Sequence, residues 1–173
     1  GFAVTIPLRR IPRSAPFRVV ADVAHDRLFA ISSSGLVAEI DHAGHKPFVS
    51  YHRVDLNGRP FEAAWAGAGK IALWGEDGLG TIDTRTWKTR AIAAGVEKAI
   101  ATPFGIAAWS TNPGDGLTVF RPDGTRRFQV LVDRYLGRAQ AVGGYLYVDT
   151  ANVRRFSINL RTGEVVGPLN QSG

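Results

Sequence analysis

The residues best suited to metal chemistry are two histidines and an aspartate beside a predicted turn. Asp41, His42 and His45 form an Asp-His-x-x-His run, and imidazole and carboxylate groups bind transition metals. The two histidines share one short turn, which is poorly shaped for a single ion, and no third ligand stands near them. A solvated turn explains this run better, so we expect no metal site.

Nucleophilic catalysis finds equally little support in the sequence. The chain has no cysteine, so neither a thiolate nucleophile nor a disulfide is available. Ser32, Ser33 and Ser34 lack the Gly-x-Ser-x-Gly turn that presents a nucleophilic serine. No glycine-rich phosphate loop precedes a predicted helix, so nucleotide binding has no support either. The sequence predicts no catalytic residue and no cofactor.

Ligand recognition is the chemistry that the residues support best. Arg134 and Arg138 flank Tyr135, and two guanidinium groups beside a phenol can bind a carboxylate, a phosphate or a sugar. The alternative is a solvated link in which Tyr135 covers the core. Loops commonly carry binding residues because a rigid scaffold holds them in place. The candidate ligand-binding residues in predicted loops are Arg59, Glu76, Lys98, Asn112, Asp115, Arg134, Tyr135 and Arg138.

The charge of the chain allows an anionic partner without requiring one. The 173 residues carry a net charge of +6, and arginine outnumbers lysine by 17 to 4. The one basic cluster larger than a pair is Arg9, Arg10, Arg13 and Arg18, so arginines spread over solvated faces explain the charge better. We retain an anionic ligand as a hypothesis, expect no binding to nucleic acid, and find no stretch apolar enough to span a membrane.

Repetition in the sequence indicates which elements position these residues. Four segments share a plan of apolar strand, turn, strand, tight turn and strand, and a weaker apolar stretch precedes each of them. Their first apolar positions are Leu28, Ile71, Ile106 and Tyr145, which are 43, 35 and 39 residues apart. Four short strands in about forty residues are typical of a β-propeller blade. The predicted fold is all-β, with about four four-stranded antiparallel propeller blades.

The predicted blades occupy approximately residues 17–56, 57–95, 96–134 and 135–173. Residues 1–16 are expected to add an N-terminal strand and a basic, proline-rich link from a preceding blade. Four blades and one extra strand do not make a closed ring of complete blades, and an open arc would leave two sheet faces uncovered. We therefore expect an arc of a larger propeller, cut from a longer polypeptide or completed by another chain. A closed four-bladed ring with a spare strand is the alternative.

Propeller blades pack face to face, so both faces of each sheet are expected to be largely apolar. The continuous apolar runs at residues 71–75 and 145–149 fit this expectation. We assign four tryptophans to packing between blades, because large rings fill the space that widens away from the axis. They are Trp65, Trp74, Trp87 and Trp109.

Three segments resemble known propeller repeats. Residues 117–130 resemble the strand–turn–strand unit of NHL-type repeats, residues 80–95 resemble the YVTN-type repeat, and residues 156–167 resemble the quinoprotein-like repeat. The chain thus resembles the bacterial β-propeller repeat superfamily over residues 17–173, which implies a propeller fold. The sequence lacks the Trp-Asp dipeptide of WD repeats and the tryptophan docking signature of quinone-cofactor enzymes.

These observations predict a non-catalytic propeller module that acts as a scaffold for binding a protein or ligand, within a larger propeller or complex. A protein partner or the remaining blades are the expected partners. The alternative is part of a propeller enzyme (a lyase, a hydrolase or a quinoprotein-like dehydrogenase) whose active site is completed by blades outside this chain. A third hypothesis is binding of an anionic polymer by the basic N-terminal segment. A periplasmic or secreted location is favoured over the cytoplasm.

Overall fold

The computed structural model describes residues 17–41, 48–56, 60–110, 112, 114–132, 135–150 and 155–167. These residues form sixteen strands and one turn of 3-10 helix, η2 (Val23–His25). The strands make four antiparallel sheets of four strands each, and within every sheet the spatial order follows the chain order. The all-β architecture and the four-stranded antiparallel units predicted from the sequence are confirmed.

Each sheet takes four successive strands. The first sheet contains β1 (Phe17–Asp22), β2 (Arg27–Ser32), β3 (Leu36–Asp41) and β4 (Phe48–Arg53). The second contains β5 (Pro60–Gly67), β6 (Lys70–Gly75), β7 (Gly78–Asp83) and β8 (Thr89–Ala93). The third contains β9 (Lys98–Thr102), β10 (Gly105–Trp109), β11 (Leu117–Phe120) and β12 (Arg126–Val130). The fourth contains β13 (Leu136–Val142), β14 (Tyr145–Thr150), β15 (Arg155–Asn159) and β16 (Val165–Val166).

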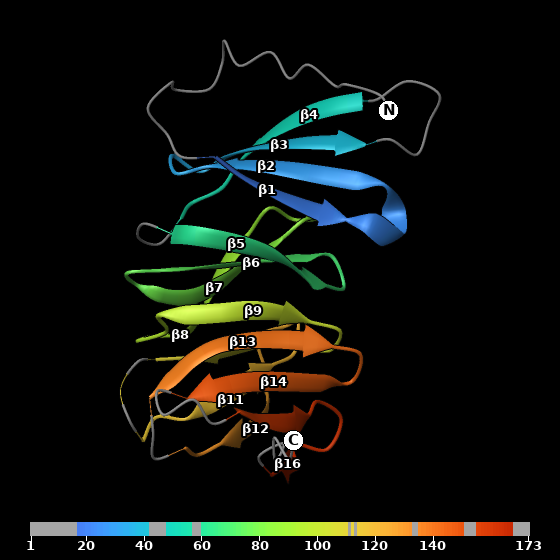
Figure 1. Cartoon of the computed structure of the whole chain (residues 1–173). Coiled ribbons are helices and arrows are strands. Elements are labelled where there is room, and N and C mark those ends of the chain that lie inside the picture. The colour runs from blue at the N-terminus through green and yellow to red at the C-terminus, as the bar shows by residue number, and fades with distance from the viewer. Residues whose placement is uncertain are drawn as a thin grey trace.

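The four sheets follow one another as a stack in chain order, from the first sheet at one end to the fourth at the other (Figure 1). The first strands of successive sheets are neighbours, because β1 contacts β5, β5 contacts β9, and β9 contacts β13. A radial arrangement with one inner strand per sheet produces this contact pattern. We refer to β1, β5, β9 and β13 as the inner strands.

Buried apolar side chains fill each space between sheets. Phe29 packs with Ile71 between the first and second sheets, and Trp74 packs with Ile106 between the second and third. Trp109 packs with Leu146 between the third and fourth. Trp65 and Trp87 border the first of these clusters, so all four tryptophans lie in contacts between sheets, as predicted.

The strand register shows which positions are equivalent in the four sheets. The fifth residue of each second strand faces a residue of the third strand across the sheet. These cross-strand pairs are Ile31–Val37, Trp74–Leu79, Trp109–Leu117 and Asp149–Arg155. The first three pairs are apolar, whereas the fourth is an ion pair. The fourth sheet therefore departs from the repeat at a position that is buried in each of the other three.

The same register corrects one position of the predicted repeat. Leu28, Ile71 and Ile106 are equivalent, as expected, but their counterpart in the fourth sheet is Leu146 and not Tyr145. Tyr145 is 41% exposed and Leu146 is fully buried. The run at residues 145–149 therefore alternates between the two faces of the sheet, and the prediction that both faces are apolar is wrong there.

The two end faces of the stack differ as a result. Alternation directs Leu28, Ala30, Ala38 and Ile40 to the side of the first sheet that faces away from the second, and we call this surface the first outer face. Arg138, Gln140, Tyr147, Asp149 and Arg155 lie on the side of the fourth sheet that faces away from the third, and we call this surface the fourth outer face. The first is apolar and the second is polar.

The turns after β7 and β15 share one hydrogen-bonding design. Asp83 Oδ1 accepts hydrogen bonds from the backbone of Arg85 and Thr86, and Asn159 Oδ1 accepts the equivalent bonds in the fourth sheet. The hydrogen bond from Lys70 and these backbone bonds lower the pKa of Asp83 to about 2. Both turns need a left-handed residue, which is Gly163 (φ 79°) in one and Trp87 (φ 58°) in the other. The Trp87 backbone is strained, and its ring stacks on His52 at 3.7 Å between centroids.

Candidate functional site

Each inner strand carries a charged side chain at nearly the same level along the strand direction. Arg18 lies opposite Ile31 and Glu62 lies opposite Trp74. Lys98 lies opposite Trp109. In β13 the register shifts between Leu136 and Ala139, which brings Arg138 beside Asp149. We call these four residues (Arg18, Glu62, Lys98 and Arg138) the axial ladder.

The ladder begins with an ion pair between two sheets. Arg18 Nη2 lies 3.2 Å from Glu62 Oε1, and both side chains are substantially exposed. Exposed ion pairs stabilise folded proteins little, so this pair matters more for the electrostatics of the surface than for the stability of the fold.

Three members of the ladder border an open hollow of about 450 Å³ between the second, third and fourth sheets. Glu62, Lys98 and Arg138 come from three different inner strands, and Glu97 adds a second carboxylate. Trp74 and Trp109 provide its apolar lining. In the described part of the chain, the buried indole Nε1 of Trp109 has no hydrogen-bond partner. The hollow thus offers apolar surface, two cations, two carboxylates and one unused N–H donor.

This hollow offers a ligand both charged and apolar contacts. The two carboxylates and two cations can pair with charged groups of either sign on a ligand, and indole rings add contact area.

The structure brings some of the predicted ligand-binding residues together and separates others. Lys98 and Arg138 line the same hollow, but they lie in strands β9 and β13 and not in loops as predicted. Glu76 is exposed in the β6–β7 turn. Asn112 and Asp115 lie in the β10–β11 loop, where Asp115 accepts a 2.6 Å hydrogen bond from Ser110. Tyr135 is 57% exposed just before β13 and does not cover the core. Arg59 and Arg134 lie outside the described residues.

Sequence reasoning missed two rungs of the ladder. Glu62 received no role, and Arg18 was counted only as part of the basic N-terminal cluster, whose other members lie outside the described residues. The sequence does contain a signal for this site. Glu62 is a charged residue within the apolar first strand of its repeat, and Lys98 is a charged residue directly before the apolar first strand of the next repeat. Identifying Glu62 and Lys98 as equivalent required the alignment of strands between repeats, and the sequence alone did not provide this alignment.

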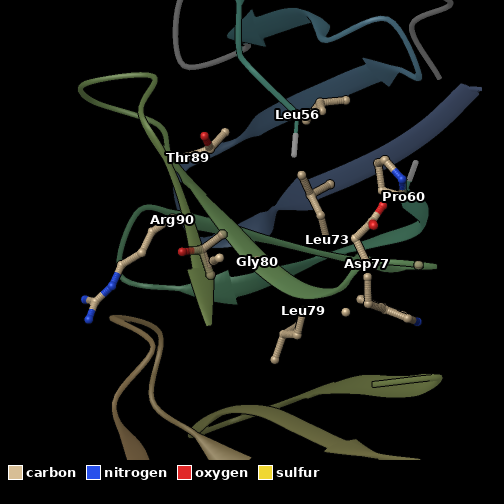
Figure 2. Close-up of a pocket in the computed structure, with 13 residues that line it drawn as sticks. Leu56, Pro60, Leu73, Asp77, Leu79, Gly80, Thr89 and Arg90 are labelled. Carbon is tan, nitrogen blue, oxygen red and sulfur yellow. The ribbon is translucent and has the colours of Figure 1, made fainter. Parts of the chain in front are cut away.

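A smaller cavity of about 70 Å³ lies beside the second sheet, and Leu56 and Pro60 border it. Leu56, Leu73, Leu79 and Gly80 line it (Figure 2). Arg90 also borders it and donates a 3.0 Å hydrogen bond to the carbonyl of Asp123 in the β11–β12 turn. A largely apolar cavity that holds only a few water molecules is a packing gap, so we do not treat it as a ligand site.

A network of charged groups lies between the first and second sheets. The Arg27 guanidinium donates to Asp22 at 2.8 Å and to Glu39 at 3.4 Å, while His52 Nε2 lies 3.2 Å from Glu39. Burial raises the pKa of Asp22, but hydrogen bonds from Arg27 and His25 outweigh burial and lower it below the usual value. Because Asp22 is only 1% exposed, Arg27 keeps a buried negative charge compensated.

The described residues contain no group of three or more histidine, aspartate or glutamate side chains placed to hold a metal ion. His42 and His45 of the Asp-His-x-x-His run lie outside those residues. Nor does that part of the chain contain a helix with the length and apolar character needed to cross a membrane.

The sheet arrangement defines the class of protein, because four radial, four-stranded antiparallel sheets are the blades of a β-propeller. Known structures agree with this assignment, and the similar chains include β-propeller proteins. No protein-family model and no curated protein matches the sequence.

Three solved structures illustrate the similarity. Dihydro-heme d1 dehydrogenase NirN is 16% identical with a TM-score of 0.63, and the match covers 92% of this chain and 38% of NirN. BamB from Moraxella catarrhalis is 16% identical with a TM-score of 0.54, covering 87% of this chain and 48% of BamB. BBS1N is 17% identical with a TM-score of 0.62, covering 92% of this chain and 58% of BBS1N. The chain thus spans less than two thirds of each, and the likeness is one of fold.

Proposed function

We propose that the chain is a non-catalytic β-propeller module that binds a protein or small-ligand partner through the axial hollow. One observation supports this proposal most strongly. Glu62, Lys98 and Arg138 come from three separate sheets and border one hollow, which tryptophan side chains also line. Residues so distant in sequence meet there because the inner strands are neighbours. A rigid scaffold that holds charged groups around apolar surface is a general design for recognition.

We also propose that the chain works as part of a larger propeller, as its resemblance to NHL, YVTN and quinoprotein-like repeats suggests. The first outer face supports this view, because Ala30, Ala38 and Ile40 continue the apolar pattern of faces that contact another sheet, and Val19, opposite Ala30, is 65% exposed. The similar structures add support, since each of them is much longer than the matched region.

Two of the similar proteins were solved with something bound. NirN was solved in complex with DHE, and BBS1N was solved in complex with ARL6DN. A small ligand and a protein partner are thus both compatible with this architecture, and the axial hollow is the place where we expect either kind to bind in this chain.

Site-specific crosslinking tests the proposal. The photoreactive residue p-benzoylphenylalanine replaces Lys98 in the hollow or, as a matched control, Lys88, which is exposed just before β8. We expect a discrete crosslinked partner from position 98 and none from position 88. The crosslink should disappear when Glu62→Lys reverses the charge of the neighbouring rung.

Equal crosslinking from both positions, or none from position 98 in the full-length parent protein, would contradict the proposal. Circular dichroism of each variant shows whether the fold is retained, since a β-propeller keeps its strand signal when only an exposed side chain changes.

A further inference from the structure

The fourth outer face breaks the pattern by which the sheets pack on one another. Asp149 occupies the position of Ile31, Trp74 and Trp109, and Arg155 occupies the position of Val37, Leu79 and Leu117. All six of those residues are buried, whereas the side chains of Asp149 and Arg155 are 41% and 57% exposed. A face built for dry contact with another sheet would not place an ion pair at a position that the other sheets bury.

The charges on this face are unequal. Arg155 Nε donates a 2.7 Å hydrogen bond to Asp149 Oδ1. This bond, opposed by partial desolvation and reinforced by the charge of Arg138, holds the pKa of Asp149 below its usual value. Two guanidinium groups and one carboxylate leave a net charge of +1. Arg155 neutralises Asp149, so Arg138 supplies the excess positive charge.

The shape of the face suits a small anionic group. Arg138, Gln140, Tyr147, Asp149 and Arg155 line a hollow of about 400 Å³ on strands β13, β14 and β15. Guanidinium and amide N–H groups are donors, and a planar guanidinium matches a carboxylate with two parallel hydrogen bonds. Exposed Val142 and Val166 border the same side of the sheet and offer apolar contact beside the charge.

We propose that the fourth outer face is a docking surface for a polypeptide partner that presents a carboxylate to Arg138 and Arg155. Charge complementarity and the donor-rich hollow favour an acidic side chain as the group recognised. This site is distinct from the axial hollow, although Arg138 borders both. Lys98 belongs only to the axial hollow and Arg155 only to the fourth outer face, so variants of these two residues separate the two proposals.

Nuclear magnetic resonance tests the assignment on the whole chain. The guanidinium Nε–Hε signals of ¹⁵N-labelled protein are followed during titration with acetylated hexaglutamate at low salt, with hexaglutamine as the uncharged control and inorganic phosphate as a third arm. Signals of Arg138 and Arg155 are assigned from their absence in Arg138→Gln and Arg155→Gln. We expect both to shift with hexaglutamate in a saturable way and to remain unmoved with hexaglutamine.

Five variants sharpen the measurement. Arg138→Gln and Arg155→Gln should each raise the dissociation constant for hexaglutamate about tenfold, because each removes one charge-assisted contact. Arg85→Gln, on the exposed β7–β8 turn, and Lys98→Ala should leave it unchanged. Asp149→Asn should tighten binding, because it removes the carboxylate that competes for Arg155, an effect that a merely structural role of Asp149 would not produce.

Three results would overturn the proposal. Equal weakening by Arg85→Gln means that hexaglutamate follows the overall positive charge and not this face. Unchanged binding in both Arg138→Gln and Arg155→Gln removes the docking surface altogether. If phosphate binds more tightly than hexaglutamate and shifts the same signals, the ligand of this face is a phosphorylated group and not an acidic polypeptide. The crosslinking experiment at position 98 tests only the axial hollow. Its failure would therefore leave these three tests of the fourth outer face unaffected.

Discussion

The first outer face and the fourth outer face terminate the same stack of sheets, yet they have opposite chemistry. On the first, Ala30, Ala38 and Ile40 are buried and apolar. On the fourth, an exposed aspartate–arginine pair stands where the other sheets bury large apolar side chains. The backbone repeat is the same at both ends. The strand register therefore determines which face of the sheet a side chain lies on, whereas the residue type determines whether that face is apolar or charged. The two ends are therefore suited to different neighbours.

The largest effect should come from placing a charge on the first outer face. Ile40→Asp puts a carboxylate at a site that is 3% exposed, and we expect a loss of about 4 kcal/mol in the free energy of unfolding, because the charge has no partner there. Val142→Asp, at a 52% exposed site on the fourth outer face, should cost less than about 0.5 kcal/mol. Urea denaturation measures both, and equal losses would abolish the contrast between the ends.

Truncation at equivalent positions of the third and fourth sheets comes next. Leu117 is fully buried, so Leu117→Ala should cost about 3 kcal/mol through lost contacts and the cavity left behind. Arg155→Ala removes a larger side chain at the same register position and should leave the urea midpoint unchanged within error. A marked loss of stability for Arg155→Ala would mean that the fourth outer face is already part of a packed core.

The comparison extends to two aspartate–arginine pairs. Asp22 is buried and Asp149 is exposed, so Arg27→Leu should destabilise the fold by about 3 kcal/mol at neutral pH. A lowered pKa in the folded state contributes stability above the ordinary aspartate pKa and loses it as the pH falls through the lowered value. The deficit of Arg27→Leu should therefore shrink in acid, which denaturation at pH 7 and pH 3 would reveal. A deficit independent of pH would rule out this origin.

The smallest effect concerns the exposed pair itself. Arg155→Gln should raise the pKa of Asp149 toward its usual value, because it removes the hydrogen bond that contributes most to the lowering. Carbon-detected titration of the side-chain carboxyl group measures the shift directly. The stability of the chain near neutral pH should change little, since exposed ion pairs contribute little. An unmoved pKa would mean that Arg155 does not pair with Asp149 in solution.

The sequence predicted the architecture because local signals repeat. Leu28, Ile71 and Ile106 recur at equivalent positions. The strand–turn–strand unit expected at residues 117–130 also forms, and Gly124 in its turn has a positive φ of 86°. The fourth repeat was misaligned by one residue, because Tyr145 continues an apolar run although it points outward. A tyrosine is compatible with both faces of a sheet, so composition alone does not set its register.

The candidate site was predicted only in part, for a different reason. Lys98 and Arg138 were identified from loops, but Glu62 and the axial ladder depend on contacts between strands about forty residues apart in the chain. No single repeat contains that information. Asp149 and Arg155 likewise look like ordinary strand-end polar residues until the register places them opposite each other, at positions that are apolar in the other sheets.

The inequality of the two ends also limits how copies of this chain can associate. Head-to-tail stacking that grows without end requires an attractive patch at both ends of each molecule. Here one end is apolar and the other carries charged side chains, so head-to-tail contact would bury Asp149 and Arg155 against an apolar face. The charged end therefore disfavours the growth of open-ended fibres.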